Sequence, residues 1–250
     1  MQASSKRHHQ TDGVMRRFRR RHSSRQPAPT KPIASVNADG KFFVTGKQDG
    51  FETFSERIGK TVTPFNGAYL DNTQVKFGST SLRLDGEEDY LRIASNNDFG
   101  FGTDDFTIEA WVYKTSSSGM TVLDFRAGIS TDNAVAIGFT GNTPYVFVNG
   151  SFEITGSSDI VLNTWTHIAY VRNGSTGTLY LDGTSVGSWT DNTDYGVTKP
   201  LVIGAVYTGT VGNFEGYVDD LRIQKGTAAY TSNFIAPLTT LFSTPNTVLL

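Results

Sequence analysis

The sequence predicts an all-β protein, a large sandwich of antiparallel strands, from three observations. Gly accounts for 26 of the 250 residues, and the 17 Phe, 10 Tyr and 3 Trp are typical of short strands joined by tight turns. Apolar residues alternate at every second position in many short runs. No long stretch carries the apolar stripe of an amphipathic helix.

The clearest pattern extends from Trp165 to Trp189. Every second residue from Trp165 to Val171 falls on one face, which is the period of a strand. Residues 178–182 alternate in the same way, and Asp182-Gly183 then supplies two residues that tolerate positive φ. We therefore expect a tight turn that folds residues 184–189 back, giving an antiparallel three-stranded meander.

The other elements follow in order along the chain. Residues 1–32 are polar and end in a Pro-rich run, which predicts an extended arm, and residues 33–250 are expected to form the folded domain. The run 106–114 carries bulky residues on both faces and is expected in mid-sheet. The further strands predicted are residues 41–45, 60–65, 75–77, 81–84, 90–93, 121–125, 134–139, 145–148, 151–154, 201–204 and 217–224.

Three further features of the strands are predicted. Asn149-Gly150 is typical of a primed turn. The alternation shifts at Asp219-Asp220, which indicates a bulge. From Gly226 the chain is expected to wrap the domain, and its apolar end, residues 246–250, to pair as an edge strand.

Charge divides the chain into two unlike parts. Residues 1–32 hold nine Lys or Arg against one acid, a net charge of +8, whereas residues 33–250 hold 13 basic and 23 acidic residues, a net charge of −10. The chain has no cysteine, which excludes disulfides and thiolate metal sites. No apolar run is long enough to span a membrane, and the N-terminus lacks the apolar region of a signal peptide, so no membrane partner is expected.

Several phrases carry a family resemblance in consistent order over roughly residues 40–242. They are KFGSTSLRLDGEEDYLRI (76–93), FGFGTDDFTIEAWVY (99–113), WTHIAYVR (165–172), LYLDG (179–183), LVIGA (201–205) and FEGYVDDLRIQKGTAAYTSNF (214–234). Together they resemble laminin G-like domains of the concanavalin A-like lectin superfamily, in the version common in bacteriophage virion proteins. The resemblance implies a jelly-roll sandwich of two antiparallel sheets, but less about function, because one fold hosts unrelated sites.

No enzyme activity is predicted. Superfamily relatives that are glucanases carry a Glu-x-Asp-x-x-Glu strand, whose carboxylates flank the sugar bond, and this chain lacks that motif. Asp85, Glu87 and Asp89 alternate, but they lie in a turn and are interpreted as a solvated loop. His167 has no Ser or Cys partner placed by the sequence and is interpreted as a hydrogen-bonded strand residue.

Two ligand hypotheses remain open at this point. Asp219 and Asp220 beside Arg222 are interpreted as a structural pair, with calcium ligation, as in many laminin G domains, as the alternative. No other cofactor is expected. Four aromatic residues, Tyr145, Trp189, Tyr195 and Tyr207, are candidates to stack on sugar rings; the alternative is that they plug the ends of the sandwich.

The predicted arm carries a cluster of guanidinium groups suited to phosphate or carboxylate partners, namely Arg16, Arg17, Arg19, Arg20, Arg21 and Arg25. The resemblance favours an anchor on neighbouring capsid or tail subunits, with nucleic acid as the alternative partner. The function predicted is therefore that of a non-enzymatic, homo-oligomeric structural protein of a phage virion, as a capsid decoration, fibre or tail component. The alternatives are a host-attachment adhesin that binds cell-surface glycan and a coat protein that contacts the genome.

Overall fold

The computed structural model describes residues 43–48, 51–55, 60–128 and 133–250, with side chains described from Lys60 onward. The predicted arm with its arginine cluster lies outside the described residues. The described residues all belong to one compact unit.

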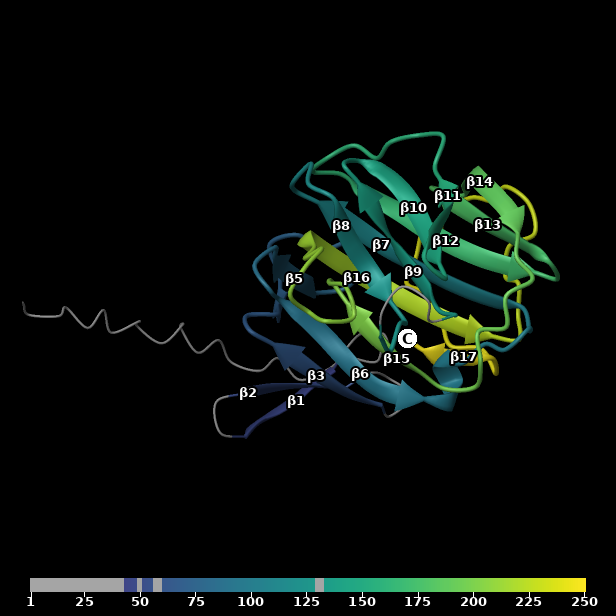
Figure 1. Cartoon of the computed structure of the whole chain (residues 1–250). Coiled ribbons are helices and arrows are strands. Elements are labelled where there is room, and N and C mark those ends of the chain that lie inside the picture. Colours follow the sequence, from purple (N-terminus) through teal and green to yellow (C-terminus); the bar gives the residue numbers. More distant parts are fainter. Residues whose placement is uncertain (1–42, 49–50, 56–59, 129–132) are drawn as a thin grey trace, which may run out of the picture. The chain divides into compact units, whose positions relative to one another are not determined.

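The described strands form two antiparallel sheets packed as a jelly-roll sandwich, so the predicted fold class is confirmed (Figure 1). In the described chain the helical content is one 3₁₀ turn, η1 (Asn97–Phe99). Sheet A runs in the order β1 (Phe43–Gln48), β2 (Phe51–Ser55), β3 (Thr61–Phe65), β6 (Tyr90–Asn96), β15 (Lys199–Ile203), β8 (Met120–Asp124), β9 (Val135–Thr140), β10 (Thr143–Val148) and β11 (Ser151–Thr155). Sheet B runs in the order β14 (Thr184–Thr190), β13 (Thr176–Leu181), β12 (Trp165–Asn173), β7 (Phe106–Lys114), β16 (Glu215–Lys225), β5 (Ser81–Asp85) and β4 (Tyr69–Asp71), with β17 (Thr247–Leu249) paired to β16.

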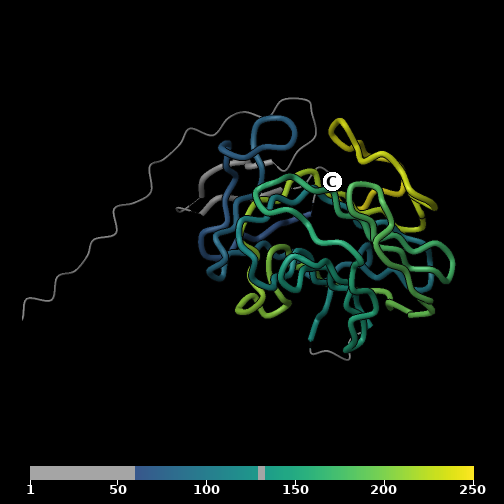
Figure 2. The backbone as a smooth tube through the Cα atoms, turned by 90° about the horizontal axis from the view of Figure 1, so that it is seen from above, coloured from purple at the N-terminus to yellow at the C-terminus, as the bar shows by residue number. Residues whose placement is uncertain are grey.

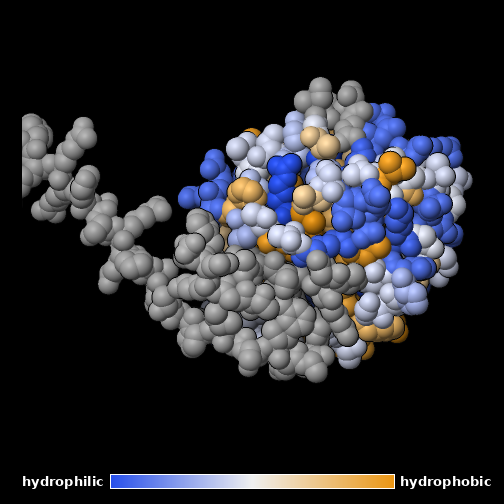
Figure 3. Space-filling view, turned by 90° about the horizontal axis from the view of Figure 1, so that it is seen from below, coloured by the Kyte–Doolittle hydropathy of each residue, from blue (hydrophilic) through white to orange (hydrophobic). Residues whose placement is uncertain are grey.

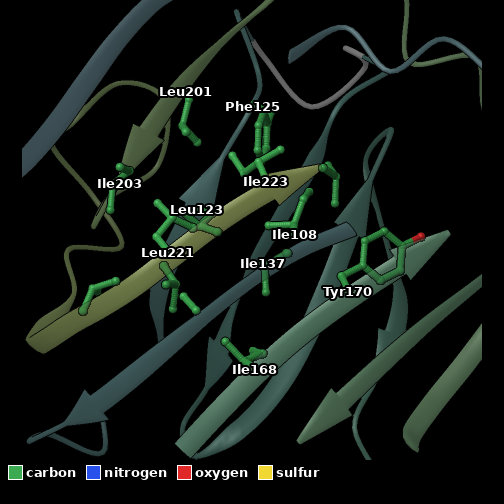
Figure 4. Packing of buried hydrophobic residues seen from close by; sticks show 14 of the residues in the cluster. Ile108, Leu123, Phe125, Ile137, Ile168, Tyr170, Leu201, Ile203, Leu221 and Ile223 are labelled. Carbon is green, nitrogen blue, oxygen red and sulfur yellow. The ribbon is translucent and has the colours of Figure 1, made fainter. Parts of the chain in front are cut away.

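The core lies between the inner faces of the two sheets. Ile108 and Ile168 of sheet B meet Leu123 and Ile137 of sheet A there, and all four are at most 2% exposed (Figure 4). The alternation of each strand puts these residues inward and leaves the intervening positions on the two outer faces. The outer faces are therefore where the fold can carry a site.

The meander and the bulge predicted from the sequence are confirmed. Strands β12, β13 and β14 pair antiparallel in order, and Asp182 and Gly183 between the last two have φ of 47° and 80°. β7 lies between β12 and β16, as expected of a mid-sheet strand. In β16 the register shifts after Asp219, and Asp220 has φ 52°.

The sequence prediction was wrong for residues 75–77, which form a loop. The backbone N–H groups of Lys76 and Phe77 donate to Asp219 Oδ2, at 2.9 and 3.0 Å, where a strand would pair with a neighbouring backbone. The short strand β4 just before this loop and the strand β2 were not predicted.

The segment after β16 covers part of the outer face of sheet B, as predicted, and Figure 2 shows it in yellow along the outside of the body. Tyr230 donates to Glu109 Oε2 at 2.7 Å, and Phe234 stacks on Tyr230 with ring centroids 3.6 Å apart. The chain then ends in β17, which pairs with the second half of β16 and confirms the predicted terminal strand.

Glu109 lies beneath this segment and joins three strands through hydrogen bonds. Its Oε1 accepts from Nε and Nη2 of Arg222 at 2.8 and 2.6 Å, and its Oε2 accepts from Nε2 of His167 at 3.2 Å. Burial alone would raise the pKa of Glu109, but the hydrogen bond from His167 and the charge of Arg222 outweigh it and lower the pKa. His167 is thus a hydrogen-bonded strand residue, as the sequence suggested.

On the face shown in Figure 3, the described residues are mostly hydrophilic. Hydrophobic residues form small separate patches among them. In the part of the chain that the structure describes, no helix has the length and apolar character needed to cross a membrane.

Candidate functional site

A fixed guanidinium group marks the outer face of sheet A. Asp124, the last residue of β8, is fully buried, and Arg126 two residues later turns back onto it. Nε of Arg126 donates to Oδ1 of Asp124 at 2.9 Å and Nη2 donates to Oδ2 at 2.6 Å. Burial would lower the pKa of Arg126, but the hydrogen bonds and charge of Asp124 outweigh it and raise the pKa, so this residue stays charged.

Aromatic rings surround this guanidinium group. Cζ of Arg126 lies 4.9 Å from the ring centroid of Phe147 and 5.3 Å from that of Tyr207. Phe152 packs edge-on against both Phe147 and Tyr145, at centroid distances of 5.3 and 5.0 Å. Phe152 is 59% exposed, so the aromatic group reaches from the buried ion pair to open solvent. We call Arg126, Tyr145, Phe147, Phe152 and Tyr207 the Arg126 site.

Two local features of the sequence position the side chains of this site: the alternation of inward and outward residues in β10, and the glycine Gly138 in β9. In β10, Val146 points into the core, which places its neighbours Tyr145 and Phe147 on the outer face. Tyr145 pairs with Gly138 of β9, where a Cβ atom would lie 2.6 Å from the phenol oxygen. Because Gly138 has no side chain, the phenol lies across the sheet and reaches Oγ1 of Thr121 at 3.0 Å. Burial raises the pKa of Tyr145.

Tyr207 reaches the site from the loop after β15. Its backbone N–H donates to Oδ2 of Asp124 at 2.9 Å, so the same carboxylate holds both this loop and Arg126. The arrangement offers flat apolar rings around a positioned hydrogen-bond donor. This combination suits a ligand with apolar faces and hydroxyl edges, as sugar rings have.

The structure thus brings together two of the four aromatic residues singled out from the sequence, Tyr145 and Tyr207. Of the other two, Tyr195 is buried and Trp189 is partly buried against the core. Tyr195 is 1% exposed and donates to Oδ2 of Asp191 at 2.8 Å, and Trp189 donates from Nε1 to the hydroxyl of Tyr170 at 2.9 Å. Because Tyr195 is buried, its ring has no face open to a sugar. It plugs the end of the sandwich, as the alternative interpretation of the sequence expected.

Asp191 is the centre of that interior group. It is fully buried and accepts from the hydroxyls of Tyr170 and Tyr195, both at 2.8 Å. Burial and the nearby carboxylate raise the pKa of both tyrosines, so both hydroxyls remain donors. The preference of a buried tyrosine hydroxyl for a partner therefore explains these aromatic residues without a ligand.

Asp219 and Asp220, the calcium candidates, hold separate loops. Asp219 binds the amides of Lys76 and Phe77, and Oδ2 of Asp220 accepts from the backbone N–H of Leu241 at 2.8 Å. Among the described residues, no group of three acidic or histidine side chains lies close enough to hold a metal ion.

The carboxylates of the turn after β5 also support the backbone. Asp89 is buried and accepts from the amides of Gly67 and Asp85, and Asp85 accepts from the amide of Glu87 at 2.7 Å. Burial raises the pKa of Asp89, and the charge of Asp85 adds to this shift. The expected solvated loop is therefore exposed at Asp85 and Glu87 but anchored by the buried Asp89.

Sequence reasoning missed the centre of the Arg126 site. Asp124 and Arg126 are two residues apart at the end of a predicted strand, and nothing in that spacing distinguishes a buried ion pair from two solvated charges. A usable signal was present in the hairpin after Tyr145, since Phe147 shares its strand face and Phe152 follows the Asn149-Gly150 turn.

Two antiparallel sheets face to face, with aromatic rings and a fixed cation on one outer face, define a lectin-like jelly-roll domain. Residues 85–230, more than half of the chain, match the family model of the concanavalin A-like lectin/glucanases superfamily. The chain belongs to this superfamily. A sequence comparison with curated proteins found no match.

Solved structures with the same fold include domains of larger proteins. Domain 4 of AbnA, a GH43 extracellular arabinanase from Geobacillus stearothermophilus, in complex with arabinotriose, is similar at a TM-score of 0.55 and 17% identity over 68% of this chain and 84% of that chain. The binding domain of botulinum neurotoxin DC in complex with SialylT is similar at 0.52 and 12%, over 77% of this chain and 49% of that chain. The chain thus spans about half the length of the toxin domain, and at these identities the similarity establishes the fold alone.

Proposed function

We propose that this protein is a non-catalytic carbohydrate-binding domain that takes its ligand at the Arg126 site. The observation that carries the proposal is the charged guanidinium of Arg126 held between Phe147 and Tyr207 on an outer sheet face. Rings of this kind stack on the apolar face of a sugar, while the guanidinium donates to hydroxyl or carboxylate oxygens at its edge. The glycan complexes of the arabinanase domain and the toxin domain support a glycan as the ligand.

The experiment is a glycan array with the full chain, followed by titration calorimetry on the glycans that bind. Phe152→Ala is expected to weaken binding roughly five- to tenfold, because it removes the most exposed ring of the site. The matched control is Phe242→Ala, since Phe242 is also an exposed phenylalanine, 68% against 59%, but lies on the C-terminal segment over sheet B. Equal binding by the wild type and Phe152→Ala, or no binding to any glycan, would refute this assignment.

We also propose a setting for the domain, the surface of a phage particle, where residues 1–32 bind neighbouring capsid or tail subunits. Two observations support this setting. The sequence segments resemble those of bacteriophage virion proteins, and residues 1–32 carry a net charge of +8 whereas residues 33–250 carry −10. A chain that begins at residue 33 is expected to lose binding to particles, and binding of the full chain to weaken as salt rises. Sedimentation of each form with particles measures this, and full binding by the shortened chain would contradict the anchor.

A further inference from the structure

A row of part-exposed side chains crosses the outer face of sheet B, with one residue from each of five neighbouring strands. In order across the sheet they are Trp165, Tyr113, Tyr217, Arg83 and Tyr69, from β12, β7, β16, β5 and β4. Each is paired directly with the next in the backbone register. None is buried, and Tyr69 is 42% exposed. We call these five residues the aromatic row.

Side-chain contacts join the first four members of the row, and Tyr69 follows through its backbone pairing with Arg83. The ring centroid of Tyr113 lies 5.5 Å from that of Trp165 and 5.8 Å from that of Tyr217. Arg83 continues the row, with its Cζ 5.0 Å from the ring centroid of Tyr217. Because neighbouring strands lie about 4.8 Å apart, five strands give a surface about 19 Å long. That length corresponds to a chain of several sugar units.

The position of the row on the sheet separates it from the parts of this face that are covered. Further along β7, Glu109 lies under the C-terminal segment, and Trp111 lies under Lys76, whose Nζ is 3.5 Å from the ring centroid. Both residues are at most 4% exposed. Tyr113 is the next outward-facing residue of the strand, and it lies beyond this cover. Aromatic residues gathered on an open sheet face mark an interaction site.

The charges beside the row indicate which polymer fits it. Arg83 and the tyrosine hydroxyls offer hydrogen bonds to hydroxyl groups. Next to the row, Glu215 of β16 pairs with Asp85 of β5, so two carboxylates follow Tyr217 and Arg83 on the same face. These carboxylates repel an acidic polymer. We propose that the aromatic row binds an extended neutral polysaccharide, separately from the Arg126 site on the other sheet.

The test uses the full chain in affinity electrophoresis with soluble neutral polysaccharides, namely β-glucan, xylan and galactomannan. At least one of them is expected to retard the wild type, and oligosaccharides of increasing length are expected to bind more tightly up to the length of the row. Tyr217→Ala, at the centre of the row, should weaken this binding roughly tenfold. Tyr69→Ala, at its exposed end, should also weaken binding with little effect on folding.

Phe242→Ala is the matched control, since it removes an exposed ring that belongs to neither site and should leave the retardation unchanged. Retardation that is lost by Phe152→Ala and kept by Tyr217→Ala would support the Arg126 site and overturn the aromatic row. Equal retardation of the wild type and both row variants would also overturn the proposal. So would a protein that binds a proline-rich peptide but is retarded by none of the polysaccharides. Circular dichroism of each variant checks that it is folded.

Discussion

Glu109→Ala is expected to lower the free energy of unfolding by about 3–5 kcal/mol, because it leaves Arg222 buried without its carboxylate partner. The side chains of Glu109 and Arg222 are 0% and 7% exposed, so solvent replaces little of what is lost. Tyr230 and His167 lose the same acceptor, and the C-terminal segment loses its hydrogen bond to sheet B. Urea unfolding at pH 7 measures the loss, and hydrogen exchange at residues 230–242 should become faster.

The pH dependence follows from the lowered pKa of Glu109. A carboxyl group whose pKa is lower in the folded state contributes stability that is fully present above its unfolded pKa, about 4.3, and is lost as pH falls through the folded value. Glu109→Gln keeps the shape and removes this contribution, so its stability should fall less steeply with acid than that of the wild type. Glu153→Ala, on edge strand β11, is the control. A Glu109→Ala protein as stable as this control would contradict the network's role.

Asp124→Asn is expected to abolish glycan binding at the Arg126 site and to destabilise the protein by about 3 kcal/mol. The carboxylate accepts from Arg126 with both oxygens and also holds the amide of Tyr207, whereas an asparagine presents an NH₂ group to one of these donors. Both the guanidinium and the tyrosine loop should therefore lose their positions. Thermal unfolding measures the loss of stability. Titration calorimetry below the melting temperature of the variant measures the loss of binding.

A double variant gives this prediction a sharper test. If the cost comes from a buried cation without a partner, Asp124→Asn combined with Arg126→Met should be less destabilised than Asp124→Asn alone, while binding stays lost. If the double variant is instead less stable than the wild type by the full sum of the two single effects, the ion pair does not explain the cost.

The sequence predicted most of the strands because residues that face the core alternate with residues that face outward, and the two kinds of position favour different side chains. The alternation in β7, β10 and β12 is a local signal of that difference, and the positive φ at Asp182 and Gly183 follows from turn chemistry in two adjacent residues. The sequence prediction failed at residues 75–77, where the apolar pattern is that of a strand. The competing effect is the carboxylate of Asp219, more than 140 residues away in the sequence, which takes the amides that a neighbouring strand would have taken.

The aromatic row and the Arg126 site were even harder to predict, because their residues meet only through contacts between distant parts of the sequence. Each member of the aromatic row lies on a different strand, and members that pair directly are separated in the sequence by up to 134 residues, from Arg83 to Tyr217. Tyr145 and Tyr195 look alike in the sequence, as aromatic residues near the ends of predicted elements. One lies on an outer sheet face and the other donates to a buried Asp191, and this difference depends on which strand is their neighbour.

The sequence by itself determined the fold class, the meander, the bulge in β16 and the family, because each depends on residues close together in the chain. The tertiary structure alone decided that Asp124 and Arg126 form a buried pair beside Phe147 and Tyr207, and that five strands line up one aromatic or guanidinium side chain each. Strand order and register set these contacts, and both arise from packing two sheets over one core, which no local pattern encodes.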